Sequence, residues 1–204
     1  MKNLLLIPLA LIISAGLFLA CKINEATPET QVWTVQAGQH GFQPNFTKPI
    51  TLYVKPNTIG TMIQFTESCR YEISPEDQGD INKAYGLGYG NWHYISFRWG
   101  FAYNPKKRMW DMYAYYYLRS NKPDWKYICS VDLVGFWTEI TNRNGHYVFT
   151  AKTHFGTFAD SVAFVTDRKM AIALEPVFGG NRTAPHRMDL YFYPRDQNLI
   201  ARND

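Results

Sequence analysis

The chain lacks several marks of enzymes and of nucleic-acid-binding proteins. It contains neither the G-x-S-x-G sequence of serine hydrolases nor a phosphate-binding Walker loop, and its five histidines have no metal-ligand spacing. Its 21 basic and 17 acidic residues give a formal net charge of only +4, and its single basic cluster is Lys106-Lys107-Arg108. The sequence therefore argues against bound zinc and against a nucleic-acid partner, and it offers no known catalytic motif.

Long amphipathic helices are also missing. After residue 21, short segments rich in β-branched and aromatic residues alternate with Gly, Pro, Asn and Asp, without a sustained repeat of 3.6 residues. Such short strands at regular spacing predict an all-β protein. We expect one antiparallel β-sandwich domain of the jelly-roll (concanavalin-like) type over residues 32–204, and the alternative is a closed β-barrel.

A long loop is predicted near residues 74–91. Ser74-Pro75 can start one or two turns of helix, and three closely spaced glycines then stop regular structure. Asp77, Asp80 and Asn82 carry the hard oxygen ligands that Ca²⁺ prefers, but without the spacing of an EF-hand. The sequence leaves open a calcium site or a loop network made by the same side chains.

The N-terminus has the pattern of an export signal. Lys2 precedes an apolar run from Leu4 to Ala20, which Cys21 follows. The ending Phe18-Leu19-Ala20-Cys21 resembles the lipobox of bacterial lipoproteins, in which the cysteine carries lipid. Soluble export and a retained anchor are the alternatives. We expect a signal peptide over residues 1–21, lipid on Cys21, a flexible tether over residues 22–31, and a place in the bacterial cell envelope, at the outer membrane.

The remaining cysteines suit an exported protein. If Cys21 carries lipid, Cys69 and Cys129 are left as an even pair in an oxidising compartment, which favours a disulfide between them. The alternative is two buried free thiols packed as small apolar side chains.

Two neighbouring segments predict a ligand-binding face. Tyr94 and Arg98 alternate with core residues in one segment, and Tyr113, Tyr115 and Tyr117 do so in the next. If the segments pair as a hairpin, these five side chains share one face. Tyrosine offers sugars an apolar ring and a hydroxyl, and arginine offers a planar fork to a carboxylate. Cross-strand packing without any ligand is the alternative.

Two stretches resemble a group of uncharacterised lipoproteins of Bacteroidetes-type bacteria. They are Glu76-Asp77-Gln78-Gly79-Asp80-Ile81-Asn82-Lys83 with the following 91–100, and Pro176-Val177-Phe178-Gly179-Gly180-Asn181-Arg182-Thr183-Ala184-Pro185-His186. The resemblance implies a concanavalin-like jelly-roll domain and a setting in which polysaccharide handling is frequent. It names no activity and transfers no functional residue.

These observations predict a noncatalytic, membrane-anchored lipoprotein that binds glycan or a similar small ligand. A polysaccharide lyase is the enzymatic alternative, with Arg98, Tyr113, Tyr115 and His154 available to neutralise a uronate and move a proton. No strand carries the paired carboxylates of a glycosidase. A structural lipoprotein that binds another protein is the third possibility.

Overall fold

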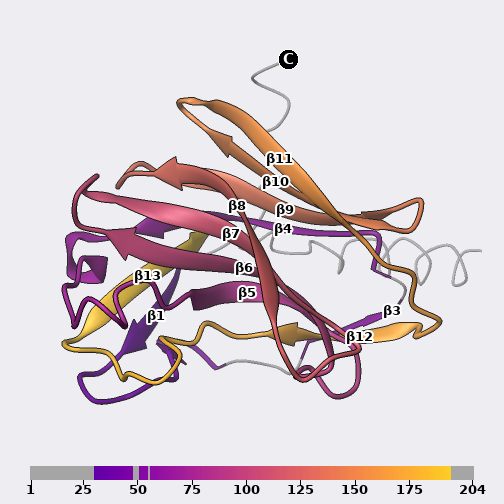
Figure 1. Cartoon of the computed structure of the whole chain (residues 1–204), viewed down its shortest axis with the longest axis horizontal. Coiled ribbons are helices and arrows are strands. Elements are labelled where there is room, and N and C mark those ends of the chain that lie inside the picture. Colours follow the sequence, from indigo (N-terminus) through magenta and orange to yellow (C-terminus); the bar gives the residue numbers. More distant parts are fainter. Residues whose placement is uncertain (1–29, 48–50, 55, 194–204) are drawn as a thin grey trace, which may run out of the picture.

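The computed structural model describes residues 30–47, 51–54 and 56–193, which form two antiparallel sheets packed face to face (Figure 1). The seven-stranded sheet has the order β11-β10-β9-β4-β13-β1-β2. In that order its strands are Gly156–Ala163, His146–Thr153, Phe136–Arg143, Thr58–Phe65, Met188–Tyr193, Gln31–Val35 and Gln43–Pro44.

The six-stranded sheet has the order β3-β12-β5-β6-β7-β8. In that order its strands are Leu52–Val54, Met170–Leu174, Asn82–Gly88, Ile95–Asn104, Met109–Leu118 and Asp124–Val131. A 3₁₀ turn, η1, spans Glu67–Cys69. The described residues confirm the predicted all-β jelly-roll sandwich, and their two sheets keep separate edges instead of closing into a barrel.

The hairpin β6–β7 is the centre of the six-stranded sheet. The two strands pair along their whole length, from Ile95 opposite Leu118 to Asn104 opposite Met109. The Asn104 side chain accepts the backbone N–H of Lys107 at 3.3 Å, which is typical of asparagine in a turn. The predicted pairing of these two segments is confirmed.

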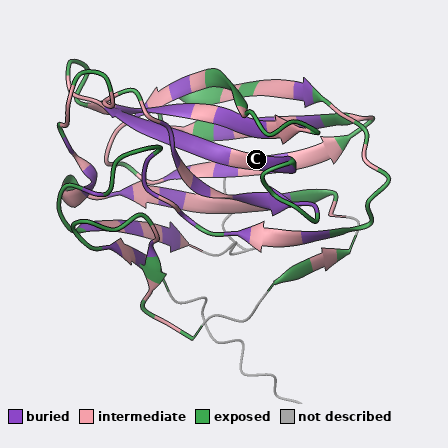
Figure 2. Cartoon of the chain, turned by 60° about the horizontal axis from the view of Figure 1, so that its bottom comes forward, coloured by how far each residue is buried: buried purple, intermediate pink, exposed green. Residues whose placement is uncertain are grey.

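An aromatic core fills the space between the sheets. Phe65 of β4 stacks on Trp110 of β7 with ring centroids 4.7 Å apart and planes at 7°. Phe97 of β6 stacks in the same manner on Tyr147 of β10. Exposed residues gather in loops and in edge strands (Figure 2), whereas β6 is buried along both of its faces, with Ser96 and Ala102 of its outer face among the buried residues. The alternation in β6 and β7 sends one set of side chains inward and leaves the other set on the outer face.

The predicted loop near residues 74–91 was wrong in its second half, because β5 occupies residues 82–88 of it. Two of its glycines, Gly86 and Gly88, are strand residues that make room for neighbours, whereas Gly90 follows the strand with a φ of 68°. A β-carbon on Gly86 would lie 2.1 Å from the carbonyl oxygen of Phe97, and one on Gly88 would lie 2.9 Å from the Leu174 side chain. Loop structure is confined to the part before β5 and to residues 89–91 after it, and the part before β5 contains a turn in which the Gln78 N–H bonds to the Ser74 carbonyl at 2.9 Å.

One pair of sheet edges is tied together. Lys126 of β8 reaches β11, where it contacts the Asp160 carboxylate at 3.3 Å and donates to the Ser161 carbonyl at 2.8 Å. On the opposite side of the six-stranded sheet lie the short strands β3 and β12 (Figure 1).

The domain begins slightly earlier than predicted. β1 starts at Gln31, which the sequence assigned to the tether. The expected signal peptide, Cys21 and the rest of the tether up to residue 29 lie outside the described residues. Within the described part of the chain, no helix has the length and apolar character needed to cross a membrane.

Candidate ligand-binding face and inter-sheet cavity

Four of the five predicted ligand-binding residues share the outer face of the six-stranded sheet. Arg98 lies opposite Tyr115 in the β6–β7 register, and Tyr113 and Tyr117 occupy the same face of β7 two residues to either side. Tyr94 lies outside β6, in a turn where its N–H bonds to the Asn91 carbonyl at 3.0 Å. Tyr94 is 39% exposed at the border of this face.

Strand β8 adds two aromatic residues that sequence reasoning missed. Trp125 lies opposite Tyr115 and Tyr127 opposite Tyr113, and each of the two β8 side chains is 52% exposed. The Tyr113 and Tyr127 rings meet edge to face at 5.9 Å. A register shift near Met112 reverses the alternation within β8, so the sequence alone could not assign these rings to the tyrosine face.

The aromatic surface continues toward the turn that precedes β6. His93 contacts the Tyr117 ring at 6.0 Å, and Trp92 contacts His93 at the same distance. Tyr117 in turn meets Tyr115 edge to face at 5.9 Å. We name the whole surface the aromatic face. It consists of Trp92, His93, Tyr113, Tyr115, Tyr117, Trp125 and Tyr127, of which Tyr115 is only 6% exposed.

Two cations border Tyr115 on this face. The Lys83 ammonium lies 4.7 Å from the centroid of the Tyr115 ring and donates to the Gly179 carbonyl at 3.2 Å. The Arg98 guanidinium donates through Nη2 to the Glu175 carbonyl, while its Nε is buried and has no hydrogen-bond partner. Burial lowers the pKa of Arg98 to about 10. Burial and then the charge of Arg98 lower the pKa of Lys83 to about 8, so both groups are cations at pH 7.

The chain after β12 holds these cations against the sheet. Val177 exchanges two backbone hydrogen bonds with Lys83, each 2.9 Å long, and the N–H of Gly179 donates to the buried side chain of Asn82. The segment therefore closes over the β5 side of the outer face and leaves the β7–β8 side open.

The three proposed calcium ligands point to different protein partners. Asp77 accepts from the Ser74 hydroxyl at 2.6 Å and from Arg182 at 2.7 Å. Asp80 accepts the N–H of Asn181 at 3.3 Å, and Asn82 donates to the Tyr71 hydroxyl at 2.8 Å.

These contacts fit the alternative reading, a network that fixes the loop. Within the described ranges no group of three or more His, Cys, Asp and Glu side chains is arranged to hold a metal ion.

The predicted disulfide is also absent from the structure, where Cys69 and Cys129 are free buried thiols. Cys69 follows β4 and donates to the Asp189 carbonyl at 3.1 Å, whereas Cys129 faces inward from β8. Burial raises the pKa of each thiol to about 11. The two residues behave as the small apolar side chains of the alternative prediction.

The histidine considered for a lyase lies elsewhere. His154 occupies the turn between β10 and β11 of the other sheet, where it contacts Asp132 at 3.4 Å and the Phe155 ring. It does not join Arg98, Tyr113 and Tyr115 on the outer face.

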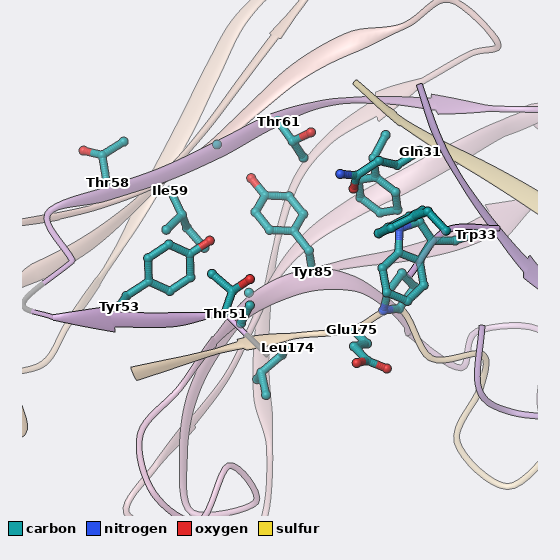
Figure 3. Close-up of a pocket in the computed structure, with 16 residues that line it drawn as sticks. Gln31, Trp33, Thr51, Tyr53, Thr58, Ile59, Thr61, Tyr85, Leu174 and Glu175 are labelled. Atoms are coloured by element: carbon teal, nitrogen blue, oxygen red, sulfur yellow. The ribbon is translucent and has the colours of Figure 1, made fainter. Parts of the chain in front are cut away.

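A cavity of about 490 Å³ opens between the sheets, on the side of β3, β12 and β5. Its walls are mainly aromatic and aliphatic, with threonine hydroxyls among them: Trp33, Phe46, Thr51, Tyr53, Thr58, Ile59, Thr61, Tyr85, Leu174 and Phe192. In Figure 3 the hydroxyls of Tyr53 and Tyr85 point toward the same space. The Tyr85 hydroxyl donates to the Thr138 carbonyl at 3.0 Å, and burial raises the pKa of Tyr53. This size and lining suit a small, mostly apolar molecule.

The fold and these surfaces define an antiparallel β-sandwich with an aromatic outer face. No known protein family matches the chain, and no curated protein matches its sequence. Among solved structures, it is similar to a functionally unknown protein from Saccharomyces cerevisiae, with a TM-score of 0.52 and 13% identity over 84% of this chain and 88% of that one.

Two further structures match less well. The tail fibre protein gp63.1 from an E. coli phage has a TM-score of 0.41 and 10% identity, over 81% of this chain and 20% of that one. The CBM2 module of the evolved Dit of a Lactobacillus casei phage has a TM-score of 0.37 and 12% identity, over 78% of this chain and 80% of that one. At such identities, similarity concerns the fold alone, so function has to be argued from this chain's own residues.

Proposed function

We propose that this protein is a noncatalytic, lipid-anchored protein of the bacterial cell envelope that binds glycan on the aromatic face. One observation carries the proposal. Trp125 and Tyr127 remain 52% exposed beside a row of tyrosines on a single sheet face. Exposed aromatic groups that cluster on one surface are typical of binding sites.

The chemistry of the face suits sugars better than an apolar partner. Its rings are mostly tyrosines, which combine an apolar plane for sugar C–H groups with a hydroxyl for sugar hydroxyls. The face extends over β7 and β8, where Tyr113 meets Tyr127 and Tyr115 meets Tyr117, so it offers several sugar units a ring each. The Lys83 and Arg98 side chains add hydrogen-bond donors at its border.

A glycan array tests this proposal. Trp125→Ala and Tyr127→Ala should each weaken an array hit about two- to tenfold, since an aromatic contact adds roughly 0.5–1.5 kcal/mol. Phe155→Ala is the matched control, because Phe155 is 54% exposed on the other sheet. All three variants should keep the wild-type melting temperature. If the Trp125 and Tyr127 variants bind the hit as the wild type does, the aromatic face is not its site.

The anchor has its own test. Cells that express the wild-type chain with a radiolabelled fatty acid should incorporate label, and Cys21→Ser should abolish it. Equal labelling of both would remove the lipoprotein part of the proposal and leave the binding part intact.

The inter-sheet cavity favours a second candidate function, the binding of a small neutral molecule with an apolar body. The neutral dye N-phenyl-1-naphthylamine is a suitable probe, because its fluorescence rises in apolar surroundings. Ile59→Trp should fill the cavity and suppress that rise, whereas Val134→Trp, at an exposed site, should not. A dye signal that is unchanged in Ile59→Trp would exclude the cavity.

A further inference from the structure

We propose that Lys83 and Arg98 form a subsite for the carboxylate or sulfate of an acidic glycan, an inference that rests on the proposed glycan-binding function. The first observation is their position. Both side chains lie on the outer face of the six-stranded sheet, and both border Tyr115 of the aromatic face. Lys83 contacts the Tyr115 ring, and Arg98 is the register partner of Tyr115.

The second observation is the lack of a carboxylate partner. The ion pairs found among the described residues include neither Lys83 nor Arg98. Lys107, another cation near an aromatic ring, does have one: it lies 5.4 Å from the Tyr127 centroid and contacts the Asp111 carboxylate at 2.9 Å. A half-buried cation without a counter-charge in contact is costly, so an anion that reaches it gains more than it would at the open surface.

The third observation is the number of donors left over. Arg98 donates from Nη2 to the Glu175 carbonyl, its Nε is buried out of a ligand's reach, and its other terminal N–H groups remain as donors. The Lys83 ammonium donates one N–H to the Gly179 carbonyl and has two further N–H donors. A guanidinium fork and an ammonium together match an oxyanion with several acceptor oxygens.

Glycines fix the place of the subsite. Arg98 lies opposite Gly86 and Lys83 opposite Gly100 in the β5–β6 register. A β-carbon on Gly86 would lie 2.9 Å from Arg98 Cγ, so the Arg98 side chain crosses β5 where no side chain obstructs it. The acidic groups of this region are Asp80, which accepts the N–H of Asn181, and Glu175, whose backbone carbonyl binds Arg98. Burial lowers the pKa of both cations, and the charge of Asp80 opposes this lowering at Lys83, as that of Glu175 does at Arg98. None of the ion pairs among the described residues joins either carboxylate to these cations.

Affinity electrophoresis of the full chain against three polymers tests the subsite. The probes are polygalacturonate, which carries carboxylates, dextran sulfate, which carries sulfates, and neutral dextran. We expect at least a tenfold preference for one acidic polymer over dextran, and the preference should shrink as salt is added. Which acidic polymer is preferred distinguishes carboxylate from sulfate.

Variants then locate the effect. Arg98→Gln and Lys83→Gln should each lower affinity for the preferred polymer about 10- to 100-fold, as expected for a hydrogen bond to a charged group. Lys122→Gln is the control, because it removes the same charge from an exposed loop and should change affinity less than twofold. Urea unfolding of each variant identifies any loss of binding that comes from misfolding. The comparison of the three polymers on the wild type tests the subsite even if a variant fails to fold.

The outcomes separate the two proposals. Equal binding of dextran and both acidic polymers, with no effect of Arg98→Gln or Lys83→Gln, overturns the subsite and leaves glycan binding in place. Acidic binding that depends on Arg98 but is indifferent to Trp125→Ala overturns the aromatic face as a glycan site. No binding to any polymer, together with an empty glycan array, overturns both. An ultraviolet-absorbing unsaturated product from polygalacturonate would show a lyase and overturn the noncatalytic assignment.

Discussion

Replacing Gly86 with alanine is expected to destabilise the sandwich strongly, because a β-carbon has no room there. It would lie 2.1 Å from the Phe97 carbonyl oxygen, 2.7 Å from Arg98 Cα and 2.9 Å from Arg98 Cγ. The two shortest distances involve the backbone of β6, which is itself held between β5 and β7. A flexible side chain could turn away from a new methyl group, but a central strand cannot.

The size of the effect follows from these contacts. Overpacking in a well-filled region costs roughly 1–3 kcal/mol. Separating β5 from β6 enough to relieve the clash also weakens adjacent ladder hydrogen bonds, each of which contributes about 1 kcal/mol. We therefore expect Gly86→Ala to lower the free energy of unfolding by about 3–4 kcal/mol, which corresponds to a fall in Tm of about 10 °C for a domain of this size.

Urea unfolding followed by tryptophan fluorescence measures this change. Gly79→Ala is the matched control, since a β-carbon at Gly79 meets nothing within 4 Å, and its stability should stay within about 0.5 kcal/mol of the wild type. If Gly86→Ala unfolds at the same urea concentration as Gly79→Ala, the close approach of β5 and β6 is wrong. The position of Arg98 across Gly86 would then be wrong as well.

Three further predictions concern buried groups. Burial lowers the pKa of Lys83 from 10.5 to about 8, so between these two pH values the unfolded chain binds more protons than the folded chain. The free energy of unfolding of the wild type should therefore rise with pH across this window, by at most about 3 kcal/mol. Lys83→Met should remove this rise in urea unfolding measured from pH 7 to 10. Cys69 and Cys129 should resist alkylation by iodoacetamide at pH 8 in the native protein and react after denaturation. The protein should also have the same gel mobility with and without reductant, and a difference in mobility would contradict the free thiols. Trp110→Phe should cost about 2–3 kcal/mol in urea unfolding, because it leaves the buried Cys69 carbonyl without its 3.1 Å partner, and a cost below 0.5 kcal/mol would show that this bond does not matter.

The sequence was most informative where alternation alone decides the structure. Ile95, Phe97 and Trp99 point inward as their spacing predicts, and the Arg98 side of β6 lies outside, next to the tyrosines of β7. Period-two patterning together with the Asn104-Pro105 turn was enough to predict this hairpin and four of the five face residues.

Long-range packing explains what the sequence could not predict. The glycines of β5 suggest a loop until it is known that Arg98 and Leu174 fill the space beside them. The face on which the Trp125 and Tyr127 rings lie depends on a register shift between β7 and β8, and the local sequence pattern does not predict this shift. The separation of Cys69 and Cys129 onto different elements is likewise a property of the topology and not of their spacing in the chain.

The strand order of the six-stranded sheet has one more consequence. The cavity is lined by strands of both sheets, whereas the open part of the aromatic face belongs to β7 and β8, beside the edge that Lys126 ties to β11. A guest held between the layers and a sugar chain lying on Trp125 and Tyr127 would thus not touch the same side chains. The two regions meet at Arg98, because Arg98 lies across Gly86 and binds the Glu175 carbonyl, and both of these residues line the cavity. A molecule that enters the cavity and shifts β5 or the chain after β12 would therefore move Arg98 and leave the β7–β8 rings in place.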